Sequence, residues 1–247
     1  MALIHSLESE GNFLFKYRGQ FPVLLFIAAI PVIYSTDYYQ ISNQSKEIYT
    51  WIAVLLSIAG FVFRAYAIGT TPKGTSGRNT QEQVAEVLNS TGIYSIVRHP
   101  LYVGNYFMWI GIVFYSFNFS FLIIVTLAYW LYYERIMFAE ERFLEKKFGK
   151  SYLDWSLNAP AFIPSFKNFK PGNITFSLKT VLRREYAGVL ATVIGFVFID
   201  VLRDSIPLKR LEFDKNNLII LGITIFIALI LRSLKHYTKI LNDENRS

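Results

Sequence analysis

The residues of this sequence best suited to chemistry lie in two short charged stretches on either side of a long apolar segment. Arg98 and His99 stand immediately before Pro100, and proline is favoured in the first turn of a helix, where its missing N–H costs nothing. The free N–H groups and the positive dipole end of such a helix favour an anion. The second stretch begins with the adjacent carboxylates Glu140 and Glu141. A basic pair and an acidic pair that meet can hold a zwitterion.

The apolar segment 101–138 must bring these two stretches together. A bilayer core of about 30 Å needs about 20 helical residues, so this segment is too long for one crossing. Polar residues around Asn118 interrupt it near its middle. We therefore predict a hairpin of two spans of about 18 residues each, with the turn at Asn118. Legs of equal length return the acidic pair to the depth of the basic pair.

A salt bridge without any catalytic role explains the same pattern. Arg98 paired with Glu140 or Glu141 would close the hairpin at the membrane boundary. Ion pairs of this kind are common and often contribute little to stability. The positions of these residues alone leave both interpretations open.

The composition indicates an integral membrane protein. Hydrophobic residues make up 53% and charged residues only 17%, whereas a soluble domain carries about 25% charged residues. Besides the hairpin, apolar runs at 21–39, 49–69, 186–202 and 217–234 approach the length of a span, although Pro22 and Pro31 interrupt the first of them. The expected fold is all-α, a multi-pass membrane helix bundle of about six transmembrane helices, within a range of about five to seven.

The distribution of Lys and Arg predicts the orientation. These residues concentrate before residue 20, between residues 70 and 100, from 135 to 184 and after 231. The positive-inside rule then places both termini and the candidate site on the cytoplasmic side, at the inner membrane if the protein is bacterial. The net charge of +7 fits loops that face anionic lipid, and we expect no nucleic-acid partner. With no Cys and three scattered His, we expect no metal site.

The chain divides into three expected parts. Residues 1–48 form an N-terminal segment with the first span, residues 49–165 form a core that contains the hairpin 101–138, and residues 166–247 form the C-terminal hairpin and most of a basic linker at 161–185. Within the core we predict a short helix over 81–88, capped by Thr80, after an irregular loop at 70–79. A second helix is predicted over 134–155, with a break at Gly149.

The two charged stretches carry a resemblance to a known family. The sequences GIYSIVRHPLYVG at 92–104, EERFLEKKFGKSYLDW at 140–155 and PAFIP at 160–164 resemble the isoprenylcysteine carboxyl methyltransferase and phospholipid methyltransferase superfamily. The resemblance covers roughly residues 50–165. It departs from the family pattern at Trp155, where the family has tyrosine, and it leaves the C-terminal spans unexplained. Matches to the pattern are Arg98, His99, Pro100, Tyr102, Gly104, Glu140, Glu141, Leu144, Phe148, Gly149 and Tyr152.

The resemblance implies a methyltransferase that binds S-adenosylmethionine on the cytoplasmic side. It implies an acceptor that is a lipid or a lipidated small molecule, an isoprenylcysteine carboxylate or a phospholipid amine, which enters from the bilayer. The oligomeric state stays open. The implied catalytic residues are Arg98, His99 and Glu141. The implied cofactor-binding residues are Gly92, Tyr94, Arg98, His99, Pro100, Tyr102, Gly104, Glu140 and Glu141.

Arg64 is the charged residue of the apolar run 49–69. It lies about 7–8 Å inside the end of that helix, where an arginine either snorkels to the interface or faces the bundle interior. If it faces the interior, its guanidinium fork suits the anionic head of the acceptor. We therefore assign it as the candidate substrate-binding residue.

Two other functions share part of this pattern. Membrane sterol reductases that use NADPH also carry an Arg-His-Pro segment, although they generally have Asn at the position of Leu101. A non-catalytic membrane protein on the same scaffold is the third hypothesis. Binding of S-adenosylmethionine, of NADPH or of neither separates the three.

Overall fold

The computed structural model describes residues 2–72 and 83–243, and these ranges contain helices and no β-strand. The expected all-α class is confirmed. The helices in chain order are α1 (Leu3–Lys16), α2 (Phe21–Ser35), the 3-10 helix η1 (Tyr38–Gln40), α3 (Asn43–Gly69), the 3-10 helix η2 (Gly92–Ser95), α4 (Pro100–Phe114), α5 (Phe119–Phe148), α6 (Lys150–Ser156), α7 (Leu178–Leu208) and α8 (Lys215–Tyr237).

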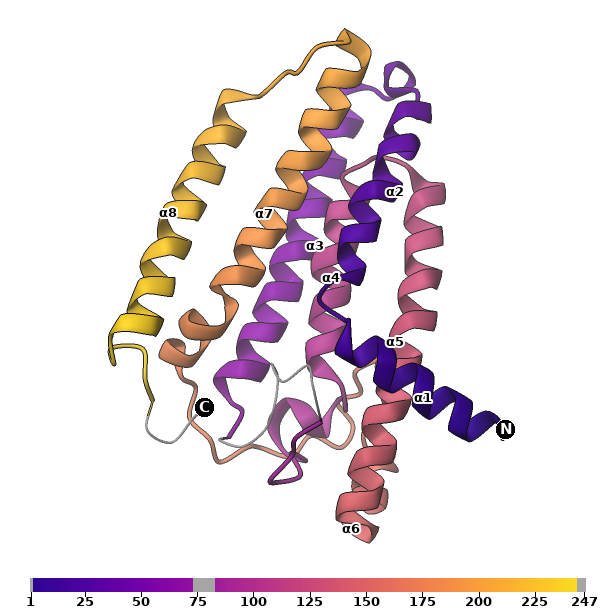
Figure 1. Cartoon of the computed structure of the whole chain (residues 1–247), viewed down its shortest axis with the longest axis vertical. Helices are drawn as coiled ribbons and strands as arrows, with labels where there is room; N and C mark the ends of the chain where they lie inside the picture. Colours follow the sequence, from indigo (N-terminus) through magenta and orange to yellow (C-terminus); the bar gives the residue numbers. More distant parts are fainter. Residues whose placement is uncertain (1, 73–82, 244–247) are drawn as a thin grey trace.

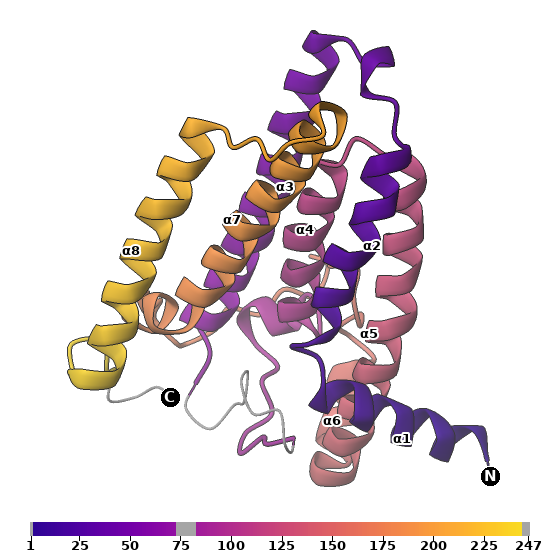
Figure 2. The ribbon, with the colours of Figure 1, turned by 45° about the horizontal axis from the view of Figure 1, so that its top comes forward.

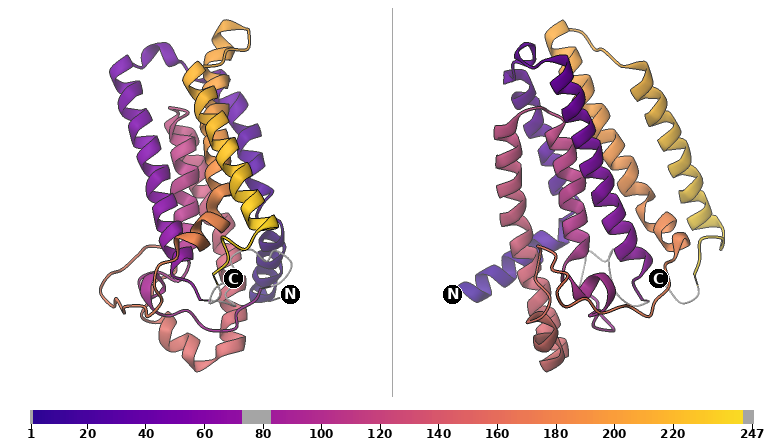
Figure 3. Two further views of the ribbon diagram at one scale, coloured as in Figure 1. Left: turned by 90° about the vertical axis from the view of Figure 1, so that its left-hand side faces the viewer. Right: turned by 180° about the vertical axis from the view of Figure 1, so that it is seen from behind.

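Five of these helices run side by side along the long axis of the molecule: α2, α3, α4, α5 and α7 (Figure 1). Helix α8 packs against α7 and forms the outer edge of the bundle (Figures 1 and 2). Helix α1 crosses α5 at a steep angle, and α6 extends beyond the same end of the bundle (Figure 3). Helix α1, α6 and the last turn of α8 therefore lie at the end of the bundle where α4 begins (Figure 1).

Four helices are long and apolar enough to cross a membrane: α3, α5, α7 and α8. Helices α2 and α4 are apolar but have 15 residues each, a length of about 22 Å against a core of about 30 Å. Helix length therefore supports four of the expected six spans directly. The chain is an integral membrane protein on the strength of these four helices.

The hairpin predicted at 101–138 is formed by α4 and α5. Its turn is at Asn118, whose Oδ1 accepts a hydrogen bond from the Phe121 N–H at 2.8 Å and caps α5. The legs are unequal, because α4 has 15 residues and α5 has 30. Helix α5 continues without interruption to Phe148, and the predicted break at Gly149, with φ +52, is confirmed.

Three local predictions are wrong. Helix α2 passes through Pro31 without a break, with Pro22 in its first turn, where a missing N–H is harmless. Residues 83–88 are not helical; Thr80, proposed as the cap of a helix there, lies outside the described residues. The linker ends before Leu178 rather than at 185, because Ser177 caps α7 by accepting a hydrogen bond from the Thr180 N–H.

Helices α3 and α4 pack closely because small residues lie where they cross. A Cβ atom on Gly60 would stand 2.5 Å from the Gly104 carbonyl oxygen and 2.6 Å from the Met108 nitrogen. Gly111 faces Ser57 in the same way, and the Ser57 hydroxyl donates to the Met108 carbonyl at 3.0 Å. Small residues of this kind let membrane helices approach.

We expect Gly60→Ala to destabilise the protein by about 1–3 kcal/mol, because the added methyl group meets backbone atoms that cannot move aside. Gly222→Ala on α8 is the matched control, since a Cβ there meets nothing within 4 Å. Unfolding in detergent, followed by circular dichroism over a denaturant titration, measures both. Equal stability of the two variants would contradict this account of the crossing.

Candidate functional site

A cleft opens at the end of the bundle where α3 ends and α4 begins. Its empty volume is about 980 Å³, which includes space open to solvent. Its walls come from α1, α3, residues 83–89, residues 94–105, α5 and α6. Of the residues selected from the sequence, it is lined by Arg64, Tyr94, Arg98, His99, Pro100, Tyr102 and Glu140. Most of the predicted site residues are thus brought together.

Arg98 and Glu141 join the two ends of the hairpin. The Arg98 guanidinium binds the carboxylate at both oxygens, with Nε–Oε1 at 2.8 Å and Nη2–Oε2 at 3.1 Å. Its Nη1 donates to the carbonyl oxygens of Ser156 and Ala159 at 2.8 and 2.7 Å. The Tyr152 hydroxyl donates to Glu141 at 2.9 Å. The pair thus forms a salt bridge that closes the hairpin, and its further contacts tie α6 to the hairpin.

The backbone at the start of the linker holds Arg98 and His99 in place. The N–H groups of these two residues donate to the carbonyl oxygens of Pro160 and Ala161 at 2.8 and 3.2 Å. The Trp155 indole N–H donates to the Tyr94 carbonyl oxygen at 2.9 Å. The residue that departs from the family pattern thus has a defined structural role, and its ring lines the cleft.

His99 lies between the two glutamates. Its Nε2 is 2.9 Å from Glu141 Oε1 and its Nδ1 is 3.4 Å from Glu140 Oε2. Because carboxylates only accept hydrogen bonds, this arrangement favours an imidazolium that donates from both nitrogens. Burial opposes the charge of His99, but the hydrogen bonds to Glu140 and Glu141 outweigh it and raise its pKa above 6.5.

The raised pKa of His99 predicts a pH-dependent stability. A group whose pKa is higher in the folded state stabilises the fold fully below its unfolded pKa, and this contribution is lost as pH rises through the folded pKa. We therefore expect the melting temperature difference between wild type and His99→Gln to be largest below pH 6.5 and to shrink at more alkaline pH. Thermal unfolding in detergent at a series of pH values measures it. His236→Gln is the control, since His236 is exposed on α8, and a difference independent of pH would refute the assignment.

Glu140 faces the cleft. It accepts a hydrogen bond from the Tyr102 hydroxyl at 2.8 Å, and the Tyr102 ring stacks on the His99 imidazole with centroids 5.6 Å apart. A carboxylate, an imidazole and a phenol are thus held together at the cleft wall. The two adjacent glutamates have different surroundings, since Glu141 pairs with Arg98 and Glu140 lines the cleft.

Arg64 lines the cleft from α3 and is held on three sides. Its Nε and Nη2 bind the two oxygens of Glu185 on α7, each at 2.7 Å. Its Nη1 donates to Asn105 Oδ1 at 2.5 Å and to the Leu101 carbonyl oxygen at 3.4 Å. The side chain therefore faces the bundle interior rather than the lipid, as the functional interpretation requires.

Gly92 and Gly104, two of the residues implied by the resemblance, have evident packing roles. Gly92 has φ +60, a conformation that favours glycine, and its N–H donates to the Lys170 carbonyl oxygen at 2.8 Å. Gly104 lies at the α3–α4 crossing, where a Cβ would meet the Arg64 side chain. Neither glycine lines the cleft itself. Each allows a backbone conformation or a close helix approach next to residues that do.

The sequence interpretation missed cleft residues from outside the motifs. Phe15 near the end of α1 and Arg18 just after it line the cleft, and Phe15 packs among Tyr102, Tyr129 and Tyr133. Glu185 was assigned to the linker. The available signal was an unpaired Arg64 in an apolar helix, which requires an acidic partner somewhere in the bundle.

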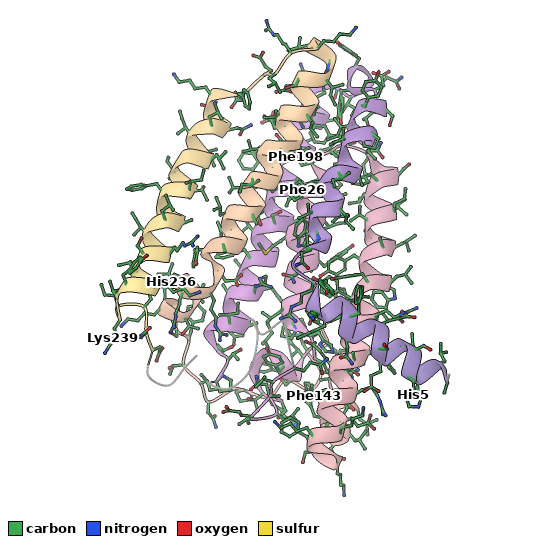
Figure 4. All side chains as sticks on the ribbon, viewed as in Figure 1. His5, Phe26, Phe143, Phe198, His236 and Lys239 are labelled. Carbon is green, nitrogen blue, oxygen red and sulfur yellow. The ribbon has the colours of Figure 1, made fainter. Side chains whose placement is uncertain are left out.

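The histidines other than His99 lie far from the cleft. His5 is near the free end of α1, and His236 is at the outer edge on α8 (Figure 4). Within residues 2–72 and 83–243 there is no group of three or more His, Cys, Asp or Glu that could hold a metal ion.

Several known proteins are similar in sequence to the part of the chain that contains these residues. A family model described as phospholipid methyltransferase matches residues 48–151. The chain is similar to the protein-S-isoprenylcysteine O-methyltransferase of Tribolium castaneum, with 26% identity over 66% of this chain and 58% of that protein. It is similar to the protein of the same name in Xenopus laevis, with 30% identity over 49% of this chain and 43% of that protein. The nickel-cobalt-cadmium resistance protein NccN of Alcaligenes xylosoxydans xylosoxydans is 29% identical over 69% of this chain and 76% of that protein.

The matched part builds most of the cleft. The chain spans 58% of the Tribolium protein and 43% of the Xenopus protein, and no solved structure matches it significantly. Residues 48–151 include both charged stretches, the hairpin and Arg64. Through this region, the chain is similar to proteins of the isoprenylcysteine carboxyl methyltransferase and phospholipid methyltransferase superfamily.

Proposed function

We propose that this protein is an integral membrane methyltransferase that transfers a methyl group from S-adenosylmethionine to an amphiphilic, lipid-like acceptor. The observation that carries the proposal is the meeting of His99, Tyr102 and Glu140 at the wall of one cleft. These residues come from the two ends of the family hairpin. The family match of residues 48–151 supports the same reaction class.

The side chains of the cleft suit the chemical groups of this cofactor. Glu140 offers a carboxylate to its ammonium group or ribose hydroxyls, and the aromatic rings of Tyr94, Phe143 and Trp155 offer apolar surface to its adenine. When bound, S-adenosylmethionine supplies a methyl group on a positively charged sulfur. Carboxylates near a cationic ligand favour its binding. Arg98 and Glu141 hold the hairpin ends together, and so position Glu140 and His99.

The protein's contribution to the reaction is to align the acceptor and to exclude water, which together supply much of the acceleration in a displacement. Arg64 would hold the polar head of the acceptor at the deep wall of the cleft. A carboxylate acceptor needs no base, whereas an amine must first lose a proton. The hydrogen bonds from His99 to two glutamates favour its charged form, so Glu140 is the better candidate to accept that proton. The distribution of Lys and Arg supports a cytoplasmic position of the cleft.

Two measurements on purified protein in detergent test the proposal. Calorimetric titration with S-adenosylmethionine and separately with NADPH distinguishes a methyltransferase from a sterol-type reductase. Transfer of a labelled methyl group is then assayed with a farnesylated cysteine that has a free carboxylate, and with vesicles that contain phosphatidylethanolamine. Binding of S-adenosylmethionine together with labelling of either acceptor supports the proposal. Binding of NADPH alone, or of neither ligand, would overturn it.

A further inference from the structure

We propose that Glu185 of α7 is a positioning residue of the acceptor site, which orients Arg64 toward the cleft. The inference rests on the proposed function and extends it beyond the part of the chain that the family model covers, residues 48–151. It gives the C-terminal hairpin a role in the site itself. Helix α7 packs against α2, α3 and α4 within the bundle, which brings Glu185 into contact with Arg64, a residue of the cleft wall.

The contact between Arg64 and Glu185 fixes one edge of the guanidinium. Both Glu185 oxygens are used, and they bind Nε and Nη2 at 2.7 Å each. A planar guanidinium bound at this edge has one remaining direction for Nη1, which points to Asn105 and the Leu101 carbonyl oxygen. Asn105 and Leu101 line the cleft together with Arg64. The orientation of Arg64 at the cleft wall thus depends on a residue of α7.

The burial of this pair argues against a purely stabilising role. Glu185 is 3% exposed, and the Arg64 side chain is 17% exposed. Burying two charges is costly, and apolar residues of similar volume often replace such a pair without loss of stability. Charged residues within membrane helices tend to mark functional sites. Without Glu185, the long Arg64 side chain would be free to turn along α3 toward the interface.

The key variants are Glu185→Gln, Glu185→Asp and the double variant Arg64→Met/Glu185→Met. They are assayed as intact protein with the acceptor that wild type methylates, a farnesylated cysteine carboxylate or phosphatidylethanolamine. For Glu185→Gln we expect KM for the acceptor to rise about tenfold, because Arg64 loses its orienting contact, with kcat and cofactor Kd changed less than about twofold. Glu185→Asp keeps the charge, and we expect it to recover part of the wild-type KM.

The double variant separates positioning from stability. It removes both charges, so we expect its melting temperature to return close to that of wild type while KM for the acceptor stays about tenfold higher. Asp200→Asn is the matched control on the same helix. Asp200 is also buried and pairs with Arg203 at 2.6 Å, but it lies about 22 Å further along α7. It should lower the melting temperature and leave KM unchanged.

Several results would overturn the inference. One is an unchanged KM in Glu185→Gln, and another is a double variant in which KM recovers together with the melting temperature. A rise of KM in Asp200→Asn as large as that in Glu185→Gln would show that any damage to α7 acts in this way. If Glu185→Gln does not fold, the KM values of Glu185→Asp and of the double variant test the inference instead. Wild-type protein that binds no S-adenosylmethionine and methylates neither acceptor would overturn the proposed function as well, whereas normal turnover with an unaffected KM would overturn this inference alone.

Discussion

Glu141→Ala is expected to destabilise the protein by about 2–4 kcal/mol, somewhat less than the roughly 3–5 kcal/mol lost when one partner of a fully buried ion pair is removed. The carboxylate accepts hydrogen bonds from Arg98, His99 and Tyr152, and the side chain of Arg98 is only 15% exposed. Its loss leaves the Arg98 guanidinium without its charge partner and releases α6 from the hairpin. Denaturant unfolding in detergent, followed by circular dichroism, measures the effect.

Glu145→Ala is the matched control for this prediction. Glu145 lies one turn further along α5 and pairs with Arg142 at 2.6 Å, but its side chain is 36% exposed. Exposed pairs of this kind contribute about 0–1 kcal/mol. A Glu141→Ala variant as stable as Glu145→Ala would show that the Arg98–Glu141 contact does not hold the site together.

Glu140→Gln is expected to weaken binding of S-adenosylmethionine about 10- to 100-fold, since hydrogen bonds that involve a charged group contribute about 1.5–3 kcal/mol. Glu140 lines the cleft and its charge is available to a cationic ligand. Glutamine has nearly the same shape, and its amide oxygen still accepts a hydrogen bond from the Tyr102 hydroxyl, so the melting temperature should fall less than in Glu141→Ala. Calorimetric titration of the variant measures the affinity.

The contrast between the adjacent glutamates makes this prediction specific. Glu134→Gln serves as the control on the same helix, because Glu134 is 49% exposed and pairs with Arg135; its cofactor affinity should equal that of wild type. Loss of stability without loss of affinity in Glu140→Gln would reverse the roles that we assign to Glu140 and Glu141. Equal affinity in Glu140→Gln and wild type would remove Glu140 from the cofactor site.

The contacts within the hairpin were predictable from the sequence. Helix rise and bilayer thickness are fixed, so an apolar segment with a polar turn at Asn118 has to return its far end to the level of its start. This argument brought Arg98 and His99 to Glu140 and Glu141, and the observed distances of 2.8 and 2.9 Å from Glu141 confirm it. The break at Gly149 was predictable for a similar local reason, since glycine readily adopts a positive φ.

The contacts between segments far apart in the chain were decided by the tertiary structure. The sequence shows an Arg64 that requires a partner, but several carboxylates satisfy that requirement equally well. The packing of α7 against α3 selects Glu185. The docking of α1 across α5, which brings Phe15 and Arg18 to the cleft, depends likewise on Gly11, where a Cβ would meet Ala139.

The difference has a physical reason. Local geometry fixes the positions of residues along one helix or hairpin to within a turn, whatever the remainder of the chain does. Which helix faces pack against each other is decided by the close packing of many side chains at once. A single sequence is compatible with several such pairings of helices. The sequence alone therefore determined an all-helical membrane protein with a charged site at the hairpin ends. The tertiary structure decided that α1, outside the family motifs, contributes to the wall of that site. It also decided that Glu185 of α7 holds Arg64 at that wall.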